Sequence, residues 1–387
     1  MSNVSHKSYK YQDDTFYDSL NSSDYEKLPL KEQMKKKMML IESLFGASKL
    51  LPMIENPTPK GYRHKAVLSA TNLKLEKSYQ IRLGLFIEGS KVIKPKLGHF
   101  LHHPGIDAIF ETLEKLLIKF KIRAYHEASG DGILKHVLIR KSYSNNQYMV
   151  VLVTQGNLFP NHKIFVRELI ELHPEISTIV QNIHHKNTHL VLLEQEKILY
   201  GPGYIEDQID DLVFRISSRS FYQVNPKQMM NLYHKALEFA EIKQNDVVLD
   251  CYSGIGTLTL LSAKKAKKAI GFEINEASVL NAITNKKINK VENAFFHQGD
   301  VQDLMNEMNE KVDVLLMDPT REGASLEFIQ SVLKLTPKRI VYISCEPKTQ
   351  IRDIKQLSQK YEVKKIQPID MFSYTAHVEN IVLLSLK

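Results

Sequence analysis

Short apolar segments alternate with stretches of helical length through the second half of the chain, and this rhythm constrains the fold more than any other feature of the sequence. Most of these segments are continuously apolar, which is typical of parallel strands that helices cover on both faces. We therefore predict an α/β protein whose residues 221–387 form a Rossmann-like domain. The segments expected to be its strands read DVVLD, KAIGFEI, NAFFHQGD, VDVLLMD, RIVYIS, VKKIQPID and NIVLLSLK.

Residues 62–220 have a different pattern. Apolar and polar residues alternate with period two around polar turns, which predicts two β-hairpins. Amphipathic helices are expected over 105–122 and 161–172. We interpret this region as a separate α+β domain.

Two segments precede that domain. The polar residues 1–28 lack periodicity and are expected to be poorly ordered. Residues 29–61 read as a helix that should end near Gly46, followed by a linker.

Positive charge is concentrated in the predicted α+β domain. The formal net charge of the chain is +8, whereas residues 60–141 alone hold more than twice as many Lys and Arg as Asp and Glu. A local excess of this kind is typical of a surface that binds a polyanion such as nucleic acid. A solvated charged face is an equally good interpretation of the charge alone.

The composition excludes several classes of site. No apolar run reaches the roughly 18 residues of a membrane-spanning helix, and the N-terminal residues contain no apolar signal core. Cys251 and Cys345, the only cysteines, are too few for a disulfide framework or for a cysteine-based zinc or iron–sulfur site. We expect a cytoplasmic protein that binds neither metal nor membrane.

A glycine-containing turn follows the first strand of the Rossmann-like domain. Gly254 and Gly256 would let the backbone approach a ligand, and Glu273 ends the next strand, where a carboxylate can bind ribose hydroxyls. This combination occurs in nicotinamide enzymes and in S-adenosylmethionine-dependent methyltransferases. The methyl donor is favoured because Thr257 follows in place of a fuller glycine motif, and because Asp300 ends the third strand, where it could hold an adenine amino group.

Three chemically active side chains should meet at the same edge of the sheet. Asp318 and Cys345 follow the fourth and fifth strands, and Glu379 precedes the last strand. A lone cysteine after an apolar run is usually a core residue. A thiolate, a base and a methyl donor together, however, suit methylation of pyrimidine carbon 5, where thiolate addition at carbon 6 activates the ring and a base then removes the carbon 5 proton.

The C-terminal half resembles the RNA 5-methyluridine methyltransferases, and it is most similar to the branch that acts on 23S ribosomal RNA. The segments FYQVNP, DCYSGIGT, MDPTREG, SCEP and DMFSYTAHVE occur in that family's order and spacing, and weaker similarity extends forward to about residue 31. The resemblance implies a class I methyltransferase domain, Cys345 as nucleophile and Glu379 as base. It implies RNA as partner, most simply as a monomer without a protein partner.

The resemblance also implies which residues bind. Phe221 would lie near the extruded uracil, and Arg63, Lys65 and Arg140 would contact RNA. Phe221 and Tyr252 have an alternative role as core aromatics, Gln223 as a helix cap, and His377 is expected to orient or pack. The residues expected at the S-adenosylmethionine site are Gln223, Tyr252, Gly254, Gly256, Thr257, Glu273, Asp300 and Asp318.

The sequence departs from the family pattern in three respects. Thr320 replaces the second proline of the family's D-P-P-R motif, and Glu346 replaces the asparagine of its S-C-N-P motif, where a carboxylate beside the nucleophile would tend to raise its pKa. Many relatives carry an N-terminal oligonucleotide-binding-type barrel and an iron–sulfur cluster held by four cysteines, and this sequence has no cysteine before Cys251.

Three alternatives to 23S ribosomal RNA methylation stay open. The first is the same reaction on the transfer RNA T-loop, and the second is an RNA-binding protein whose catalysis has lapsed. The third, a nicotinamide-dependent oxidoreductase, leaves Cys345, Glu379 and the basic domain unexplained.

Overall fold

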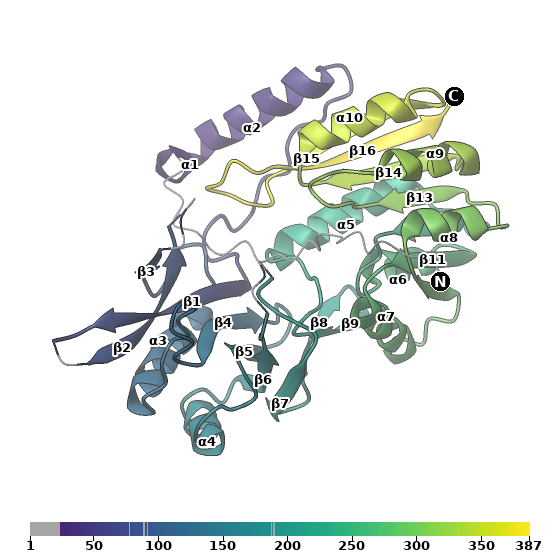
Figure 1. Ribbon diagram of the computed structural model, residues 1–387. Coiled ribbons are helices and arrows are strands. Elements are labelled where there is room, and N and C mark those ends of the chain that lie inside the picture. Colours follow the sequence, from purple (N-terminus) through teal and green to yellow (C-terminus); the bar gives the residue numbers. More distant parts are fainter. Residues whose placement is uncertain (1–23, 77, 88–89, 91, 187, 189) are drawn as a thin grey trace.

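The computed structural model describes residues 24–387 except 77, 88–89, 91, 187 and 189 (Figure 1). The prediction of poor order for residues 1–28 falls outside the described residues up to position 23. Residues Asp24–Lys27 form the short helix α1. No helix in the described part of the chain is long and apolar enough to cross a membrane.

The first sheet contains both predicted hairpins, and all its neighbouring strands are antiparallel except β5 and β6. One face carries α3 (Pro104–Lys119) and α4 (His162–Leu172), whose apolar residues share a core with the strands. In sheet order the strands are β3 (Ile93–Pro95), β2 (Tyr79–Phe86), β1 (Lys65–Lys74), β4 (Leu134–Lys141), β5 (Tyr148–Thr154), β6 (Ile176–Ile183) and β7 (Glu196–Tyr200).

Local sequence explains where α3 begins. Pro104 occupies its first turn, where a proline is pre-set for helix, and the His103 side chain accepts a hydrogen bond from the Gly105 amide. The apolar residues of α3 recur at helical spacing, so a single face of the helix packs on the sheet.

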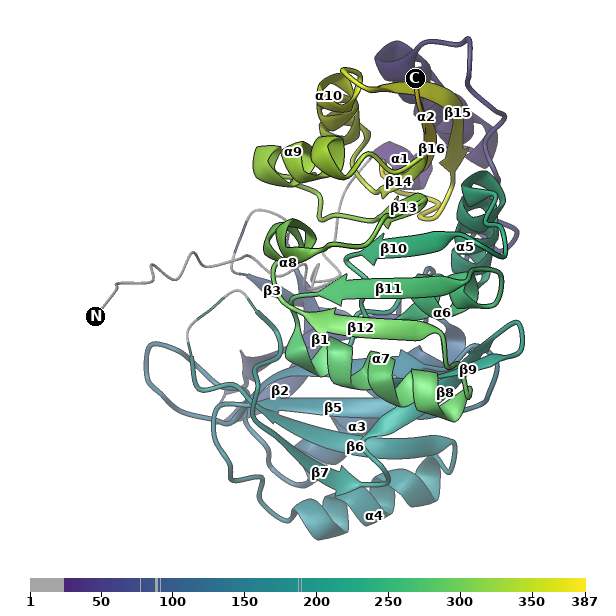
Figure 2. The same ribbon diagram turned by 90° about the vertical axis from the view of Figure 1, so that its right-hand side faces the viewer.

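A small hairpin lies between the two sheets (Figures 1 and 2). It consists of β8 (Tyr204–Ile209) and β9 (Leu212–Ser217). The side-chain oxygens of Asn289 and Asn285 accept hydrogen bonds from the Val213 and Arg215 amides, each at 2.8 Å. Asn285 lies on a helix of the second sheet, and the Glu206 amide of the hairpin donates a hydrogen bond of 2.8 Å to the side-chain oxygen of Gln147, just before β5 of the first sheet. The hairpin therefore links the two sheets.

The second sheet has the predicted Rossmann-like pattern. β12, β11, β10, β13 and β14 are parallel, whereas β16 is antiparallel and lies between β14 and β15. All seven strand segments predicted from the sequence are present. In sheet order they are β12 (Ala294–Gln298), β11 (Lys268–Glu273), β10 (Val247–Cys251), β13 (Val314–Met317), β14 (Arg339–Ser344), β16 (Glu379–Leu386) and β15 (Tyr361–Ile369).

Helices cover both faces of this sheet (Figure 2). On one face α5 and α6 share a core with alternate strand residues such as Val248 and Leu316. On the other face α8, α9 and α10 pack against the residues between them, such as Leu249 and Leu315. The helices are α5 (Pro226–Ala240), α6 (Thr257–Ala263), α7 (Glu276–Ile288), α8 (Val301–Glu307), α9 (Leu326–Leu335) and α10 (Pro347–Leu357).

The N-terminal segment packs on the second sheet. The helix α2 (Leu30–Phe45), which ends at Gly46 as predicted, lies beside α10 and β15 (Figure 1). The segment predicted as a linker does more than connect, because Leu50 and Ile54 form parallel bridges with Ile366 and Ile369 of β15.

Candidate active site

The carboxyl ends of β13 and β14 and the start of β16 meet at one edge of the second sheet. In the antiparallel pairing of β14 with β16, Ser344 faces Asn380, which brings Cys345 beside Glu379. Asp318 follows β13, the other neighbour of β14. The structure therefore brings together the three residues that the sequence predicted at this edge.

The surroundings of Cys345 oppose ionisation of its thiol. The side chain is partly exposed, and burial raises its pKa well above the usual range, with the carboxylates of Glu379 and Asp318 raising it further. Arg321 acts in the opposite direction, because its guanidinium donates a hydrogen bond to the sulfur and its charge favours the thiolate. Near neutral pH the thiol is protonated, and its reactivity depends on this balance of charges.

Sequence reasoning missed the role of Arg321. The residue lies in the quoted segment MDPTREG, two residues beyond Pro319, but the spacing gave no indication of which way its side chain points. A guanidinium at the end of one strand, next to a cysteine at the end of the neighbouring strand, was the available signal.

Glu346 does not act on the nucleophile as the sequence suggested. Its side chain is the N-cap of α10 and accepts a hydrogen bond from the Lys348 amide at 3.2 Å. The carboxylates that raise the pKa of Cys345 are those of Glu379 and Asp318. The Glu346 carboxylate is therefore directed toward the start of α10 and not toward the Cys345 thiol.

Glu379 is buried, and His377 near it in sequence is half-buried. Glu379 is 3% exposed. Burial lowers the pKa of His377 to about 4, and the charges of Arg321, Lys37 and Arg63 lower it as well, so the imidazole is neutral at physiological pH. Its ring lies edge-on to Phe372 with 6.4 Å between ring centroids. This environment fits the orienting or packing role predicted for His377.

The glycine turn after β10 forms a cradle beside Glu273. The Gly254 and Asn275 amides donate hydrogen bonds of 3.0 and 2.8 Å to its carboxylate, and burial raises the pKa of Glu273. A Cβ on Gly254 would meet no atom of the described residues within 4 Å, so this turn faces open space. The Ser253 hydroxyl is buried without a hydrogen-bond partner in the described part of the chain. The open turn at Gly254 leaves room for a nucleoside ligand. The Ser253 hydroxyl and the Glu273 carboxylate offer that ligand hydrogen-bonding groups.

Backbone conformation is strained on the same turn. Tyr252 has φ 69°, in the left-handed region that non-glycine residues rarely adopt, and its ring packs at 5.7 Å from that of Phe328. Gly256 also has positive φ, and a Cβ there would come within 2.6 Å of the Phe296 ring. Only glycine fits at that position.

The remaining residues predicted at the cofactor site lie around this turn. Thr257 is the first residue of α6, and Gln223 is buried just before α5, near the half-buried Phe221. Asp300 caps α8 by accepting a hydrogen bond from the Gln302 amide at 3.0 Å. This cap engages one oxygen of the carboxylate that the sequence assigned to adenine.

Two of the residues predicted to contact RNA require correction. Lys65 and Arg140 face each other in the pairing of β1 with β4 and are only 6% and 3% exposed. Arg140 donates a hydrogen bond to the Ser220 carbonyl at 2.8 Å. Because their side chains are buried, they offer little surface to a phosphate backbone. Arg63 is only partly buried and acts on His377, so it lies close to the candidate site.

A cavity of about 760 Å³ lies between residues 58–61 and residues 96–111. The exposed Lys60, Lys96 and Phe100 contribute to its lining, as do Asp107 and Glu111. The Phe100 ring is 41% exposed and meets the Tyr374 ring edge-on with 5.2 Å between centroids. The Lys60 ammonium lies 5.8 Å from the Tyr374 ring centroid. Aromatic and cationic side chains thus continue from this cavity to the segment that carries Glu379.

Comparisons with known proteins find similar RNA methyltransferases. The family model described as tRNA (uracil-5-)-methyltransferase matches residues 164–387. An RNA methyltransferase of Enterococcus faecalis is 37% identical over 341 residues, which cover 87% of this chain and 74% of that protein. One from Staphylococcus aureus is 33% identical over 346 residues, covering 89% and 76%.

A solved structure shares the fold. The tRNA (uracil-54, C5)-methyltransferase of Pyrococcus abyssi, in complex with S-adenosyl-L-homocysteine, superposes with a TM-score of 0.75 at 24% identity, covering 92% of this chain and 84% of that one.

Proposed function

This chain belongs to the RNA (uracil-5-)-methyltransferase family, and we propose that it methylates carbon 5 of a uridine with Cys345 as the nucleophile and Glu379 as the base. As a member it is an S-adenosylmethionine-dependent RNA methyltransferase. The observation that carries the proposal is the pairing of Ser344 with Asn380, which sets Cys345 beside Glu379 at the ligand edge of the sheet.

The reaction needs two bond changes at sulfur. Cys345 Sγ loses its proton to solvent and bonds to carbon 6, while the electron pair of the carbon 5–carbon 6 double bond moves onto the ring as an enolate. S-adenosylmethionine, when bound, would supply an electrophilic methyl group to carbon 5 and would leave as S-adenosylhomocysteine. The Glu379 carboxylate then removes the proton from carbon 5, the double bond forms again, and the Sγ–carbon 6 bond breaks with its electron pair returning to sulfur.

Residues around the glycine turn would hold the methyl donor. Glu273 would bind the ribose hydroxyls, and the open space at Gly254 would admit the nucleoside. The other residues assigned to this site are Gln223, Tyr252, Gly256, Thr257, Asp300 and Asp318.

We assign 23S ribosomal RNA as the substrate and keep the transfer RNA T-loop as the alternative. The motif resemblance favours ribosomal RNA, whereas the P. abyssi structure is that of an enzyme named for uridine 54 of transfer RNA. Mass mapping of 5-methyluridine in both RNAs from cells with and without this gene distinguishes them. A uridine that loses its methyl group in only one RNA class identifies the substrate.

We propose the cavity beside Tyr374 as the RNA-binding surface. Lys60, Lys96 and Phe100 take the place of Lys65 and Arg140, since exposed aromatic and cationic side chains can stack on bases and pair with phosphates. This proposal keeps the two roles predicted from the sequence. Residues 62–220 contact RNA, and residues 221–387 carry out catalysis.

The second candidate is an RNA-binding protein that has lost its catalytic activity. The reason for considering it was the departure from the family motifs at Thr320 and Glu346. Glu346 caps a helix, and the Thr320 carbonyl accepts a hydrogen bond from the Gly323 amide at 2.8 Å, so both residues have local structural roles. Labelled methyl incorporation decides between the candidates. RNA binding without incorporation would support the lapsed protein.

The Glu379→Gln variant tests the mechanism. It should form a covalent adduct with a 23S ribosomal RNA transcript, visible as a shifted band on a denaturing gel, because the methylated intermediate cannot lose its carbon 5 proton. The Cys345→Ala variant is the control and should give no band. Methylation by the wild type without any adduct from Glu379→Gln would overturn the assigned role of Glu379.

A further inference from the structure

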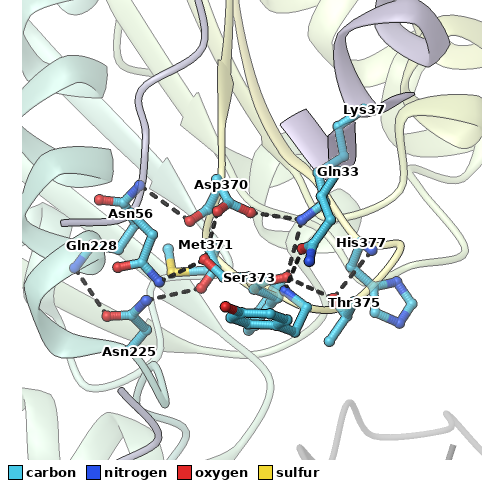
Figure 3. A network of polar contacts seen from close by, with 12 residues as sticks. Gln33, Lys37, Asn56, Asn225, Gln228, Asp370, Met371, Ser373, Thr375 and His377 are labelled. Carbon is cyan, nitrogen blue, oxygen red and sulfur yellow. Dashed lines mark hydrogen bonds and ion pairs between the residues drawn. The ribbon is translucent and has the colours of Figure 1, made fainter. Parts of the chain in front are cut away.

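Residues 370–378 form a loop that joins the end of β15 to Glu379, the first residue of β16. We call this segment the base loop. Because Glu379 directly follows it, the path of the base loop decides where the Glu379 carboxylate lies. Figure 3 shows that polar side chains from three other segments of the chain bind this loop.

Lys37 of α2 makes the central contact. Its side chain is completely buried, and its ammonium lies 2.6 Å from Asp370 Oδ1 and 3.0 Å from the Phe372 carbonyl oxygen. Asp370 Oδ2 accepts a hydrogen bond from the Ser373 hydroxyl at 2.5 Å. One ammonium therefore binds a side chain and a backbone carbonyl at the start of the base loop.

A second residue of α2 holds the middle of the loop. The Tyr374 amide donates a hydrogen bond of 2.8 Å to the side-chain oxygen of the buried Gln33. Tyr374 has φ 63°, a left-handed conformation that a non-glycine residue keeps only where the surrounding contacts impose it. Gln33 and Lys37 are four residues apart and face the loop from successive turns of the helix.

Other parts of the chain complete the support. Asn56 and Tyr62 bond Ser373, and residues at the start of α5 bond backbone carbonyls of the loop. These contacts are Asn56 Nδ2 to Ser373 Oγ at 3.0 Å, Tyr62 OH to the Ser373 carbonyl at 3.0 Å, Asn225 Nδ2 to the Met371 carbonyl at 2.9 Å, and Gln228 Nε2 to the Asp370 carbonyl at 3.2 Å.

Stability alone does not account for a buried ion pair here. Desolvating two charges offsets much of their attraction, and apolar residues of similar size often serve as well or better. What an ammonium supplies, and an apolar side chain does not, is a directional link to both the Asp370 carboxylate and the Phe372 carbonyl. The pair therefore fixes the geometry of the segment that leads to Glu379.

We propose that Lys37 is a positioning residue for the base, which acts through Asp370 and the Phe372 carbonyl to hold Glu379 where it can remove the carbon 5 proton. This inference rests on the function proposed above and extends it to a helix outside the part of the chain that the family model matches, residues 164–387. Loss of Lys37 should slow resolution of the covalent adduct more than its formation.

The test separates those two steps with two forms of one 23S ribosomal RNA transcript. The uridine form requires proton removal, whereas a 5-fluorouridine form traps the adduct in any enzyme that can form it, because fluorine cannot leave as a proton does. The ratio of adduct on uridine RNA to adduct on 5-fluorouridine RNA then reports on the base. A protein that is merely less stable gives less adduct on both transcripts and leaves the ratio unchanged.

The variants are Lys37→Met and the double variant Lys37→Met/Asp370→Asn. The double variant removes the unpaired carboxylate as well, so it keeps the proposal testable where the single one fails to fold. Lys35→Met is the matched control, since Lys35 is an exposed residue of the same helix. We expect turnover about ten- to a hundredfold slower in the Lys37 variants, as for a misplaced catalytic group, with a raised adduct ratio. Lys35→Met should behave like the wild type.

The outcomes distinguish this inference from the function that it rests on. A folded double variant with the wild-type adduct ratio, beside a Glu379→Gln protein that accumulates adduct, overturns the role of Lys37 alone. On a transcript that the wild type methylates, absence of adduct from Glu379→Gln on uridine RNA and from the wild type on 5-fluorouridine RNA overturns the proposed mechanism and this inference with it.

Discussion

Arg321 donates a hydrogen bond to the sulfur of Cys345, and its positive charge opposes the carboxylates that raise the pKa of that thiol. The nucleophile therefore lies between groups of opposite effect on its ionisation. Removing the guanidinium should make the thiol less reactive, and removing a carboxylate should make it more reactive.

Alkylation of Cys345 by iodoacetamide measures this balance, because the thiolate is the reacting form. In Arg321→Met the pKa should rise further and alkylation should slow, whereas in Glu379→Gln the pKa should fall and alkylation should accelerate, by about tenfold for each unit of pKa. A Cys251→Ser background removes the second, buried cysteine. Changes of the same sign in both variants would contradict the arrangement described here.

Glu346 should influence stability and leave the nucleophile unchanged. Glu346→Ala removes the side-chain cap of α10 and should lower the free energy of unfolding by about 1 kcal/mol, measured by urea denaturation. Glu346→Asn, which keeps a capping oxygen, should recover most of that loss. The alkylation rate of Cys345 should match the wild type in both, and acceleration in either would show that Glu346 faces the thiol.

Charge reversal should have different effects at buried and exposed basic residues. Arg140→Glu removes the buried hydrogen bond to the Ser220 carbonyl and puts a carboxylate, which cannot donate, next to that oxygen, so it should destabilise the protein by about 1–3 kcal/mol. Lys60→Glu, at the cavity beside Tyr374, should leave the melting temperature unchanged and weaken RNA binding. The slope of the logarithm of the RNA-binding constant against the logarithm of salt concentration should decrease in magnitude by about one, as expected for one lost phosphate contact. Unchanged RNA binding would remove Lys60 from the RNA surface.

Asp250 should make folding depend on pH. Burial raises its pKa to about 7, although the Thr259 hydroxyl donates a hydrogen bond of 2.6 Å to it. A carboxyl whose pKa is higher in the folded protein binds a proton more tightly there. Its contribution to stability is therefore complete below about pH 4 and is lost as the pH rises through 7.

Asp250→Asn removes that titration. The free energy of unfolding of the variant minus that of the wild type should increase between pH 4 and 7, by at most about 1.4 kcal/mol per pH unit. Urea denaturation across this range checks the sign. A difference that stays constant with pH would show that Asp250 ionises normally.

The strands and the meeting point of Cys345, Asp318 and Glu379 were predictable, because both follow from local pattern. Continuously apolar segments predicted buried parallel strands, and the carboxyl ends of such strands lie on one edge. The helix over residues 30–45 was equally predictable from its apolar spacing and from Gly46.

Burial of Lys65 and Arg140 was not predictable, because partners distant in sequence decide it. Alternation along β1 and β4 marks two faces without saying which is covered, and Arg140 is held by Ser220, far along the chain. The docking of Leu50 and Ile54 on β15 was missed for the same reason. The orientation of Glu346 depends on the first turn of α10, where a carboxylate can either cap the helix or face its neighbour.

The bridges from Leu50 and Ile54 to β15 also set an order of events during synthesis. The segment that contains them leaves the ribosome long before residues 361–386, so it has no sheet edge to join while the intervening chain is made. Its apolar side chains must wait through that interval, exposed or transiently bound elsewhere. Contacts so far apart in sequence form slowly, and closure of the second sheet at this edge should be a late step of folding.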